Sequence, residues 1–375
     1  MVGQICMANT TDALAWLARR DGSVVIGQGP FTTAAREPAD GVAFYVQDFA
    51  LQDHLPWKIP ASIERTTIVE LAARLTGTPQ LEAQWHALDA APFASVFQEI
   101  MTSIHGGLFE KTVPVVTQTG TAGLAPGPAI QAAMWRQGTP LQSYGWLDQQ
   151  DGFAGATPEL LFALHDKQLE TMALAGTARS EDREVFAVDE KEIREHEYVA
   201  QTLVAKLMNL GRLERRSREI LDLGSIVHFL TLINVELQTS LTPTDLLQRL
   251  HPTPALGPLP RTDGTMAKLL EWRRRLGCPS HFGAPFGLWD GGRFDAIVAI
   301  RGVWWEGAQL RIPAGCGIIE ASRLVNEWHE LRLKREAVMR CLKLPAADHT
   351  AAHSGGVLPR VPQPPLNGPS EMSSY

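Results

Sequence analysis

Two pairs of glutamates, each spaced three residues apart, are the side chains in this sequence best suited to chemistry. Glu192 and Glu195 lie near the start of one predicted helix, and Glu327 and Glu330 lie in the last predicted helix. Residues three apart share a helix face, and both pairs adjoin apolar residues that we expect to point inward. Buried like charges need a compensating cation. Carboxylate oxygens without a set of Cys or His ligands nearby favour Mg²⁺, so the sequence predicts a magnesium site.

Each pair taken alone also has an ordinary structural explanation. Asp189 and Glu192 have the spacing of a helix capping box, in which Glu192 would only satisfy a backbone donor. Glu330 and Lys334 could form an exposed ion pair worth only about 0.2–0.5 kcal/mol. The occurrence of two pairs on inward faces is what favours the metal.

A glycine-rich turn and one arginine are the next candidates. Gly315 and Gly317 flank Cys316, and successive N–H groups in such a turn can cradle an anion, although a plain tight turn has the same composition. Arg301 lies in an apolar stretch, 294–304, that predicts a strand. A guanidinium there needs either a structural carboxylate or a bidentate substrate carboxylate as its partner.

The elements that position these residues alternate between strand pairs and long helices. Apolar periodicity and turn residues predict hairpins over 159–174 and 294–313 and a strand over 111–117. This order favours an α+β fold of antiparallel-rich sheets flanked by helices. The predicted helices are 62–75, 97–104, 189–210, 241–251, 264–276 and 322–342.

Length and composition place these elements in one large domain. The 375 residues divide into an N-terminal lobe of the same domain (1–90), a core (91–345) and a Pro-, Ser- and Gly-rich tail (346–375) that we expect to be disordered. Hydrophobic residues make up 45% of the chain, which is enough for a sizeable core. The net charge of −7 argues against a nucleic-acid surface.

The remaining sequence signals concern the compartment. The four cysteines, none in a Cys-x-x-Cys spacing, are expected to be reduced thiols. We find neither a signal peptide nor 18 consecutive apolar residues. These observations predict a cytoplasmic protein without a membrane segment.

An ordered set of short segments between residues 93 and 342 resembles the chorismate-utilising enzymes. This family includes isochorismate synthase, salicylate synthase, and the large subunits of anthranilate and aminodeoxychorismate synthases. The matching segments are Thr157-Pro-Glu159-Leu-Leu, Ala173-Leu-Ala-Gly176-Thr177, Glu190-Lys-Glu192-Ile-Arg-Glu195-His196, Val227-His228-Phe-Leu-Thr231, His251-Pro-Thr-Pro-Ala-Leu-Gly257, Ala299-Ile-Arg301, Ala314-Gly-Cys-Gly317-Ile and Glu327-Trp-His-Glu330 with Lys334.

The resemblance implies a two-lobed sandwich of sheets and helices around a buried site. It implies that the four glutamates surround Mg²⁺, with Glu195 and Glu330 as direct ligands, and that the metal holds the ring carboxylate of chorismate. The other substrate-binding residues it implies are Arg301, Lys334 and the N–H groups of Gly315 and Gly317 for the carboxylate oxygens, and Gly176, Thr177 and His228 along the ring.

The same resemblance implies the reaction. Glu159 matches the general acid that protonates the departing C4 hydroxyl, and Lys111 falls where water-adding members carry a lysine base. This predicts an isochorismate synthase-like isomerase of siderophore, menaquinone or salicylate biosynthesis. Salicylate synthase is one alternative, and an aminating subunit with a separate amidotransferase is another. A non-catalytic chorismate-binding protein is less well supported. The chain departs from the family pattern at Ala178-Arg-Ser-Glu181 and at Cys316.

Overall fold

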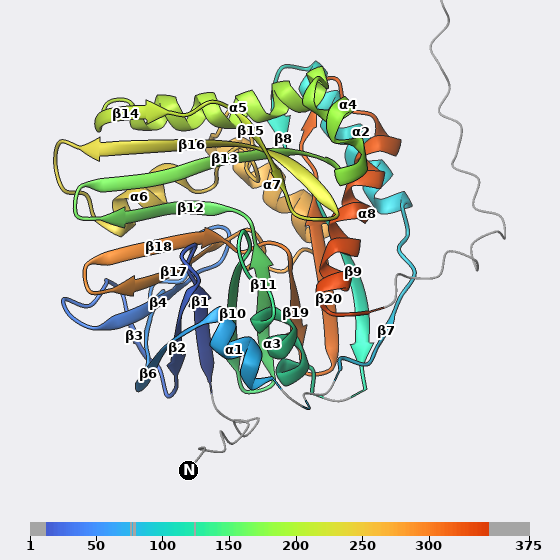
Figure 1. Cartoon of the computed structure of the whole chain (residues 1–375). Coiled ribbons are helices and arrows are strands. Elements are labelled where there is room, and N and C mark those ends of the chain that lie inside the picture. The colour runs from blue at the N-terminus through green and yellow to red at the C-terminus, as the bar shows by residue number, and fades with distance from the viewer. Residues whose placement is uncertain (1–12, 76, 78–79, 124, 345–375) are drawn as a thin grey trace, which may run out of the picture.

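Two large antiparallel sheets form the frame of the molecule. The computed structural model describes residues 13–75, 77, 80–123 and 125–344, so the predicted tail lies outside the described residues. In Figure 1 the strands of one sheet run across the view and those of the other run up it. The nine-stranded sheet contains, in spatial order, β6 (Ser62–Thr67), β2 (Ser23–Gln28), β1 (Leu14–Ala18), β10 (Gln142–Asp148), β11 (Asp151–Thr157), β19 (Gly302–Glu306), β20 (Gln309–Gly315), β9 (Val115–Ala122) and β7 (Ala83–Trp85).

The second sheet has ten strands, and the N-terminal part of the chain contributes to both sheets. β1, β2 and β6 belong to the first sheet, whereas β3, β4 and β5 belong to the second. The second sheet contains β14 (Gly211–Arg215), β16 (Ile226–Leu237), β13 (Gln168–Arg179), β12 (Leu160–His165), β18 (Arg293–Val298), β17 (Pro285–Asp290), β4 (Val42–Val46), β5 (Trp57–Ile59) and β3 (Thr32–Ala34), with β15 (Glu219–Asp222) also paired to β16. A short separate pair joins β8 (Lys111–Thr112) to β21 (Ile318–Ile319).

Helices cover these sheets. α5 lies along β13 and β16 at the top of Figure 1, and α8 descends beside β20. None of the helices in the described residues is long and apolar enough to cross a membrane. The helices are α1 (Ile68–Arg74), α2 (Ala91–His105), α3 (Gly127–Trp135), α4 (Arg183–Ala187), α5 (Glu190–Leu207), α6 (Pro243–Leu250), α7 (Asp263–Arg275) and α8 (Leu324–Cys341), and a 3₁₀ turn, η1, covers Ser180–Asp182.

The main core lies between the two sheets. Phe153 of the first sheet and Phe286 of the second meet edge to face, with ring centroids 5.8 Å apart. Helix α5 adds Val199, Leu203 and Leu207, all buried, so its apolar stripe faces inward as predicted. Burial of this apolar surface is the main force that holds the sandwich together.

Several predicted elements are confirmed and three need correction. The hairpin β12–β13 and the helices α5 to α8 are present, and β19 pairs with β20 across the predicted turn. The predicted helix 62–75 is wrong in its first half, which is strand β6. Helix α1 starts only at Ile68, because Thr67 and Glu70 form a capping box there. The predicted strand 111–117 splits into β8 and β9 around Val113-Pro114, where Pro114 has no N–H for a ladder bond.

The third correction concerns Arg301. The predicted strand 294–304 is two strands, β18 and β19, which belong to different sheets. Arg301 lies at the crossing point, not within a strand, and its backbone adopts φ of 58°. Left-handed backbone is uncommon for a residue with a side chain and persists only where the surroundings impose it. The chain passes between sheets here and so brings Arg301 to the space between them.

Candidate active site

A small cavity between the sheets collects most of the residues predicted to do chemistry. Its volume is about 60 Å³. Apolar side chains that sequence reasoning did not assign, Leu174, Ala255 and Phe282, complete its wall. The predicted residues that line it are Glu159, Gly176, Thr177, Glu195, His228, Arg301, Gly315, Gly317 and Lys334.

The remaining predicted residues lie just outside this cavity. Glu192, Glu327 and Glu330 line an adjoining cavity of about 550 Å³, which also contacts Thr177. Lys111 lines neither cavity among the described residues and reaches the first one through its contact with Glu195.

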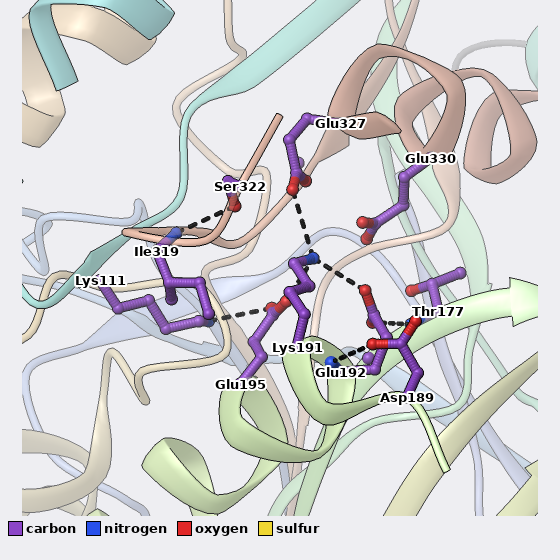
Figure 2. A network of polar contacts seen from close by, with 12 residues as sticks. Lys111, Thr177, Asp189, Lys191, Glu192, Glu195, Ile319, Ser322, Glu327 and Glu330 are labelled. Atoms are coloured by element: carbon purple, nitrogen blue, oxygen red, sulfur yellow. Dashed lines mark hydrogen bonds and ion pairs between the residues drawn. The ribbon is translucent and has the colours of Figure 1, made fainter. Parts of the chain in front are cut away.

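Lys191 lies at the centre of the acidic cluster. Figure 2 shows its ammonium group among the carboxylates of α5 and α8. Its Nζ is 2.8 Å from Oε1 of Glu192, 3.2 Å from Oε2 of Glu195 and 3.3 Å from Oε1 of Glu327. Burial lowers the pKa of Lys191, but the neighbouring carboxylates outweigh burial and hold it well above its usual value. Sequence analysis did not assign this residue, although its position beside Glu192 and four residues before Glu195 was a usable signal.

The start of α5 fixes the first carboxylate pair. The side chain of Asp189 accepts a hydrogen bond from the N–H of Glu192, 3.1 Å, and so caps the helix. Glu192 does not return a bond to the cap, so the capping-box explanation is wrong for its side chain. Its Oε2 instead accepts the N–H of Thr177 on β13, 2.9 Å. The C-terminal part of β13 is thereby joined to α5.

The second pair on α8 is not a solvated charged face. Oε1 of Glu330 is 2.6 Å from Nζ of Lys334, and their side chains are only 9% and 17% exposed. Lys334 also donates to the carbonyl of Gly315, 2.8 Å, so α8 is joined to the end of β20. Burial raises the pKa of Glu330, but Lys334 and Lys191 outweigh it and the net shift is downward.

The donor chemistry of the cluster fits a hard divalent cation. Glu327 is buried, its Oε1 forms the ion pair with Lys191, and no hydrogen bond of normal geometry reaches either of its carboxylate oxygens from the described residues. Burial raises the pKa of Glu327 to about 8 and that of Glu192 to about 7, as expected for carboxylates that lack enough positive charge around them. In this arrangement no three His, Cys, Asp or Glu side chains among the described residues approach closely enough to hold a metal. Lys191 occupies the space between them.

Glu159 and Lys111 are both buried beside the cavity. Glu159 precedes β12, and burial raises its pKa to about 7, against the opposing effect of Lys111. Lys111 is completely buried, with Nζ 3.3 Å from Oε1 of Glu195, and donates to the carbonyl of Pro254. A Cβ placed on Gly317 would lie 2.9 Å from Cε of Lys111. The glycine is therefore required for the close approach of this lysine.

His228 and Arg301 form another part of the cavity wall. Nη2 of Arg301 lies 2.7 Å from Nε2 of His228, and Nδ1 of His228 lies 2.6 Å from the carbonyl of Gly176. Because a guanidinium only donates, Nε2 must accept and Nδ1 must carry the proton. Burial and the adjacent Arg301 hold the pKa of His228 well below its usual value, which agrees with a neutral ring. Burial also lowers the pKa of Arg301 to about 10.

Comparison with known proteins finds one consistent group. A family profile described as chorismate binding enzyme matches residues 54–343. Isochorismate synthase MenF of Bacillus subtilis is 32% identical over 218 residues, which cover 53% of this chain and 45% of that protein. The salicylate biosynthesis isochorismate synthase of Pseudomonas aeruginosa is 30% identical over 261 residues, 65% of this chain and 53% of that protein. The chain thus matches about half the length of these relatives.

Solved structures show the same fold at lower sequence identity. The menaquinone-specific isochorismate synthase MenF of Escherichia coli superposes with a TM-score of 0.74 at 20% identity, over 89% of each chain. Anthranilate synthase component I of Streptococcus pneumoniae superposes with a TM-score of 0.61 at 14% identity, over 91% of this chain and 94% of that one. The two-sheet α+β architecture predicted from the sequence is therefore confirmed.

Proposed function

The chain belongs to the chorismate binding enzyme family, and from this premise we propose that it converts chorismate to isochorismate. The reaction adds water at C2 of the ring and releases the C4 hydroxyl as water. It needs one group to accept a proton from the attacking water and another to deliver a proton to the departing oxygen.

Two buried residues supply these groups, Glu159 on the central cavity and Lys111 behind Glu195, which lines that cavity. Glu159 lines the cavity, and because its pKa is raised to about 7 it holds a proton near neutral pH and can give it to the C4 oxygen. Lys111, in its neutral form, accepts the proton of the water that forms the new C2–O bond. One proton is taken up and one is given out, so the protein needs no other reactant. The burial of a lysine and a carboxyl beside one cavity is the observation that carries the proposal.

The cationic wall orients the substrate. Arg301 and Lys334 both line the cavity and can pair with the carboxylates of a dianionic ring acid. Neutral His228 donates its proton to the Gly176 carbonyl and accepts from Arg301, which holds the guanidinium in place. The apolar side chains Leu174 and Phe282 exclude water from the rest of the ring.

We propose Mg²⁺ as the cofactor, held by Glu192, Glu195, Glu327 and Glu330. The carboxylate of Glu327 supports this assignment, because it is buried and has an ion pair with Lys191 but no hydrogen bond of normal geometry from the described residues. When bound, the metal would supply positive charge for the ring carboxylate. Lys334, paired with Glu330, balances part of the negative charge around it.

Product analysis tests the proposal. Purified protein is incubated with chorismate and Mg²⁺, with and without ammonia, and the products are separated by chromatography. We expect isochorismate in both samples. Pyruvate and salicylate would identify a salicylate synthase, and an aminated product formed only with ammonia would identify the aminating class. Binding of chorismate by calorimetry without any product would identify a binding protein.

A lysine variant tests the assigned base. Lys111→Gln should lower kcat by about 10²-fold or more, because proton transfer by a positioned group contributes about 10²–10⁴-fold. Lys268→Gln, at a partly exposed lysine of α7, is the matched control. Thermal unfolding establishes that both variants fold. An unchanged rate in folded Lys111→Gln would remove the lysine from this role.

A further inference from the structure

Two further cavities adjoin the central one, and each shares a single lining residue with it among the described residues. Thr177 is shared with the cavity of about 550 Å³, which we call the acidic cavity. Arg301 is shared with a cavity of about 310 Å³, which we call the arginine cavity. The arginine cavity is lined by Gln137, Leu141, Ala156, Leu223, Ser225, Ile226, Arg301, Ala337, Val338, Arg340 and Cys341.

The two side cavities carry opposite charge. The acidic cavity is lined by five carboxylates, Asp182, Asp189, Glu192, Glu327 and Glu330, and by the cations Arg179, Lys191 and Arg323. The arginine cavity has two guanidinium groups and no carboxylate among its described lining residues. Clefts lined by charge of one sign concentrate ligands of the opposite sign and raise their rate of association.

We propose that the arginine cavity is the entrance for the anionic substrate, whereas cations reach the cluster through the acidic cavity. This inference rests on the proposed function only in the identity of the substrate, a ring acid with two carboxylates. Such a dianion is repelled by the acidic cavity and attracted by the arginine cavity. The central cavity, at about 60 Å³, is below the range of about 300–1,000 Å³ that ligand sites usually occupy, whereas the arginine cavity lies within it.

Arg340 is the capture residue of this entrance. It lies in the last turn of α8 and is exposed. Its side chain makes no hydrogen bond or ion pair in the described part of the chain, so its charge is available to a ligand. The leucines, Ile226 and Val338 provide apolar wall for a carbon ring beside it.

Arg301 is the residue that passes the substrate inward. Its side chain has one hydrogen-bond partner in the described structure, Nε2 of His228. Loss of that single bond frees the guanidinium to turn toward the arginine cavity, which would join the two spaces. The carboxylate of an arriving ligand can replace His228 as its partner, so the charge remains satisfied during entry.

A labelling experiment tests the entrance without depending on turnover. Cys341 lines the arginine cavity and is partly buried. An anionic methanethiosulfonate reagent should modify it faster than a cationic one of similar size, by roughly 10-fold at low ionic strength, and Arg340→Glu should reverse the preference. Cys341→Ser identifies the labelled site by mass spectrometry. Equal rates for both reagents, or a preference that Arg340→Glu leaves unchanged, would overturn the charge assignment.

Kinetics then connect the entrance to catalysis. Arg340→Glu should lower kcat/KM for chorismate by about 10-fold at low salt, with kcat nearly unchanged and the loss shrinking as salt rises. Arg274→Glu makes the same charge change at an exposed arginine in the last turn of α7 and should behave as wild type. Equal effects of the two variants would refute the entrance. Absence of turnover in the wild type would instead refute the proposed function. The labelling rates would still test the charge of the entrance, because they do not depend on turnover.

Discussion

Gly317→Ala is expected to abolish most activity while leaving the fold intact. The added Cβ would overlap Oε1 of Glu195, and it would lie 2.6 Å from Cδ of Glu195 and 2.9 Å from Cε of Lys111. Ordinary carbon contacts are about 3.5–4.0 Å, so both side chains must move by about 1 Å. Both contacts are made near the ends of long side chains, which can move without displacing the backbone.

The size of the effect follows from what those side chains do. A misplacement of about 1 Å in a catalytic arrangement can cost about 10²-fold in rate. We therefore expect kcat/KM to fall about 10²-fold and the affinity for Mn²⁺, used as a probe of the carboxylate cluster, to fall as well. Overpacking costs about 1–3 kcal/mol of stability in a packed core, and the flexible side chains should hold the loss of unfolding free energy at the lower end.

Gly315→Ala is the matched control. Its Cβ would lie 3.1 Å from Cγ1 of Val113 and 3.3 Å from the carbonyl of Pro114, neither of which belongs to the cluster. It adds the same methyl group two residues away and keeps the backbone N–H, so its loss of kcat/KM should be much smaller. Chromatographic rates, calorimetric Mn²⁺ affinity and thermal unfolding are measured on both variants. If Gly317→Ala keeps kcat/KM within about threefold of wild type and binds Mn²⁺ normally, Glu195 and Lys111 do not need their present positions.

Three other outcomes follow from the same structure. With Glu159 titrating at a pKa of about 7, its carboxyl loses the proton as pH rises, so kcat/KM should fall above about pH 7; Glu159→Gln should remove this limb of the pH profile along with most of the rate, and a limb that persists in the variant contradicts the assignment. Lys191→Gln should lower the melting temperature of metal-free protein and enlarge the increase produced by Mg²⁺, because the carboxylates lose their resident cation; equal increases in calorimetry would show that Lys191 does not compete with metal. Leu203→Ala, at a fully buried position of α5, should cost about 2–5 kcal/mol of unfolding free energy in denaturant titration, with kcat retained at temperatures where the variant is folded.

Local pattern was enough for the long helices α5 to α8 and for the hairpins, but not for the start of α1 or for the crossing at Arg301. The amphipathic stripe of α5 and the turn between β19 and β20 are visible in the sequence because each depends on residues close in the chain. The apolar run 294–304 reads as one strand, since residues on either side of Ala299-Ile300 have the same character. That the chain changes sheets there depends on partners far away in the sequence, β12 for β18 and β11 for β19. Sequence periodicity contains no such information.

The candidate site also has features that the sequence predicts and features that depend on long-range contacts. The ordered motifs were enough to name the polar and charged residues that line the cavity, because each motif is local and the resemblance supplies their assembly. They could not show how the buried charges are balanced. The spacing of Lys191 from Glu192 and Glu195 was a local signal, but its contact with Glu327 depends on α8 packing opposite α5. A long-range contact of this kind has no signature in a single segment.

Lys111, Lys191 and Lys334 differ in their hydrogen-bond partners. This difference determines which side chain moves when a metal binds. Lys111 is wholly buried and held by the carbonyl of Pro254 as well as by Glu195. Lys334 is held by the carbonyl of Gly315 as well as by Glu330. Lys191 has only carboxylate partners, and its side chain, 20% exposed, borders the acidic cavity.

Two cations cannot share the space between the same carboxylates without strong repulsion. Removal of an ammonium group that has a backbone acceptor would leave that carbonyl unsatisfied. Lys191 alone can leave toward solvent without that cost, so we expect it to be the side chain that moves when Mg²⁺ binds.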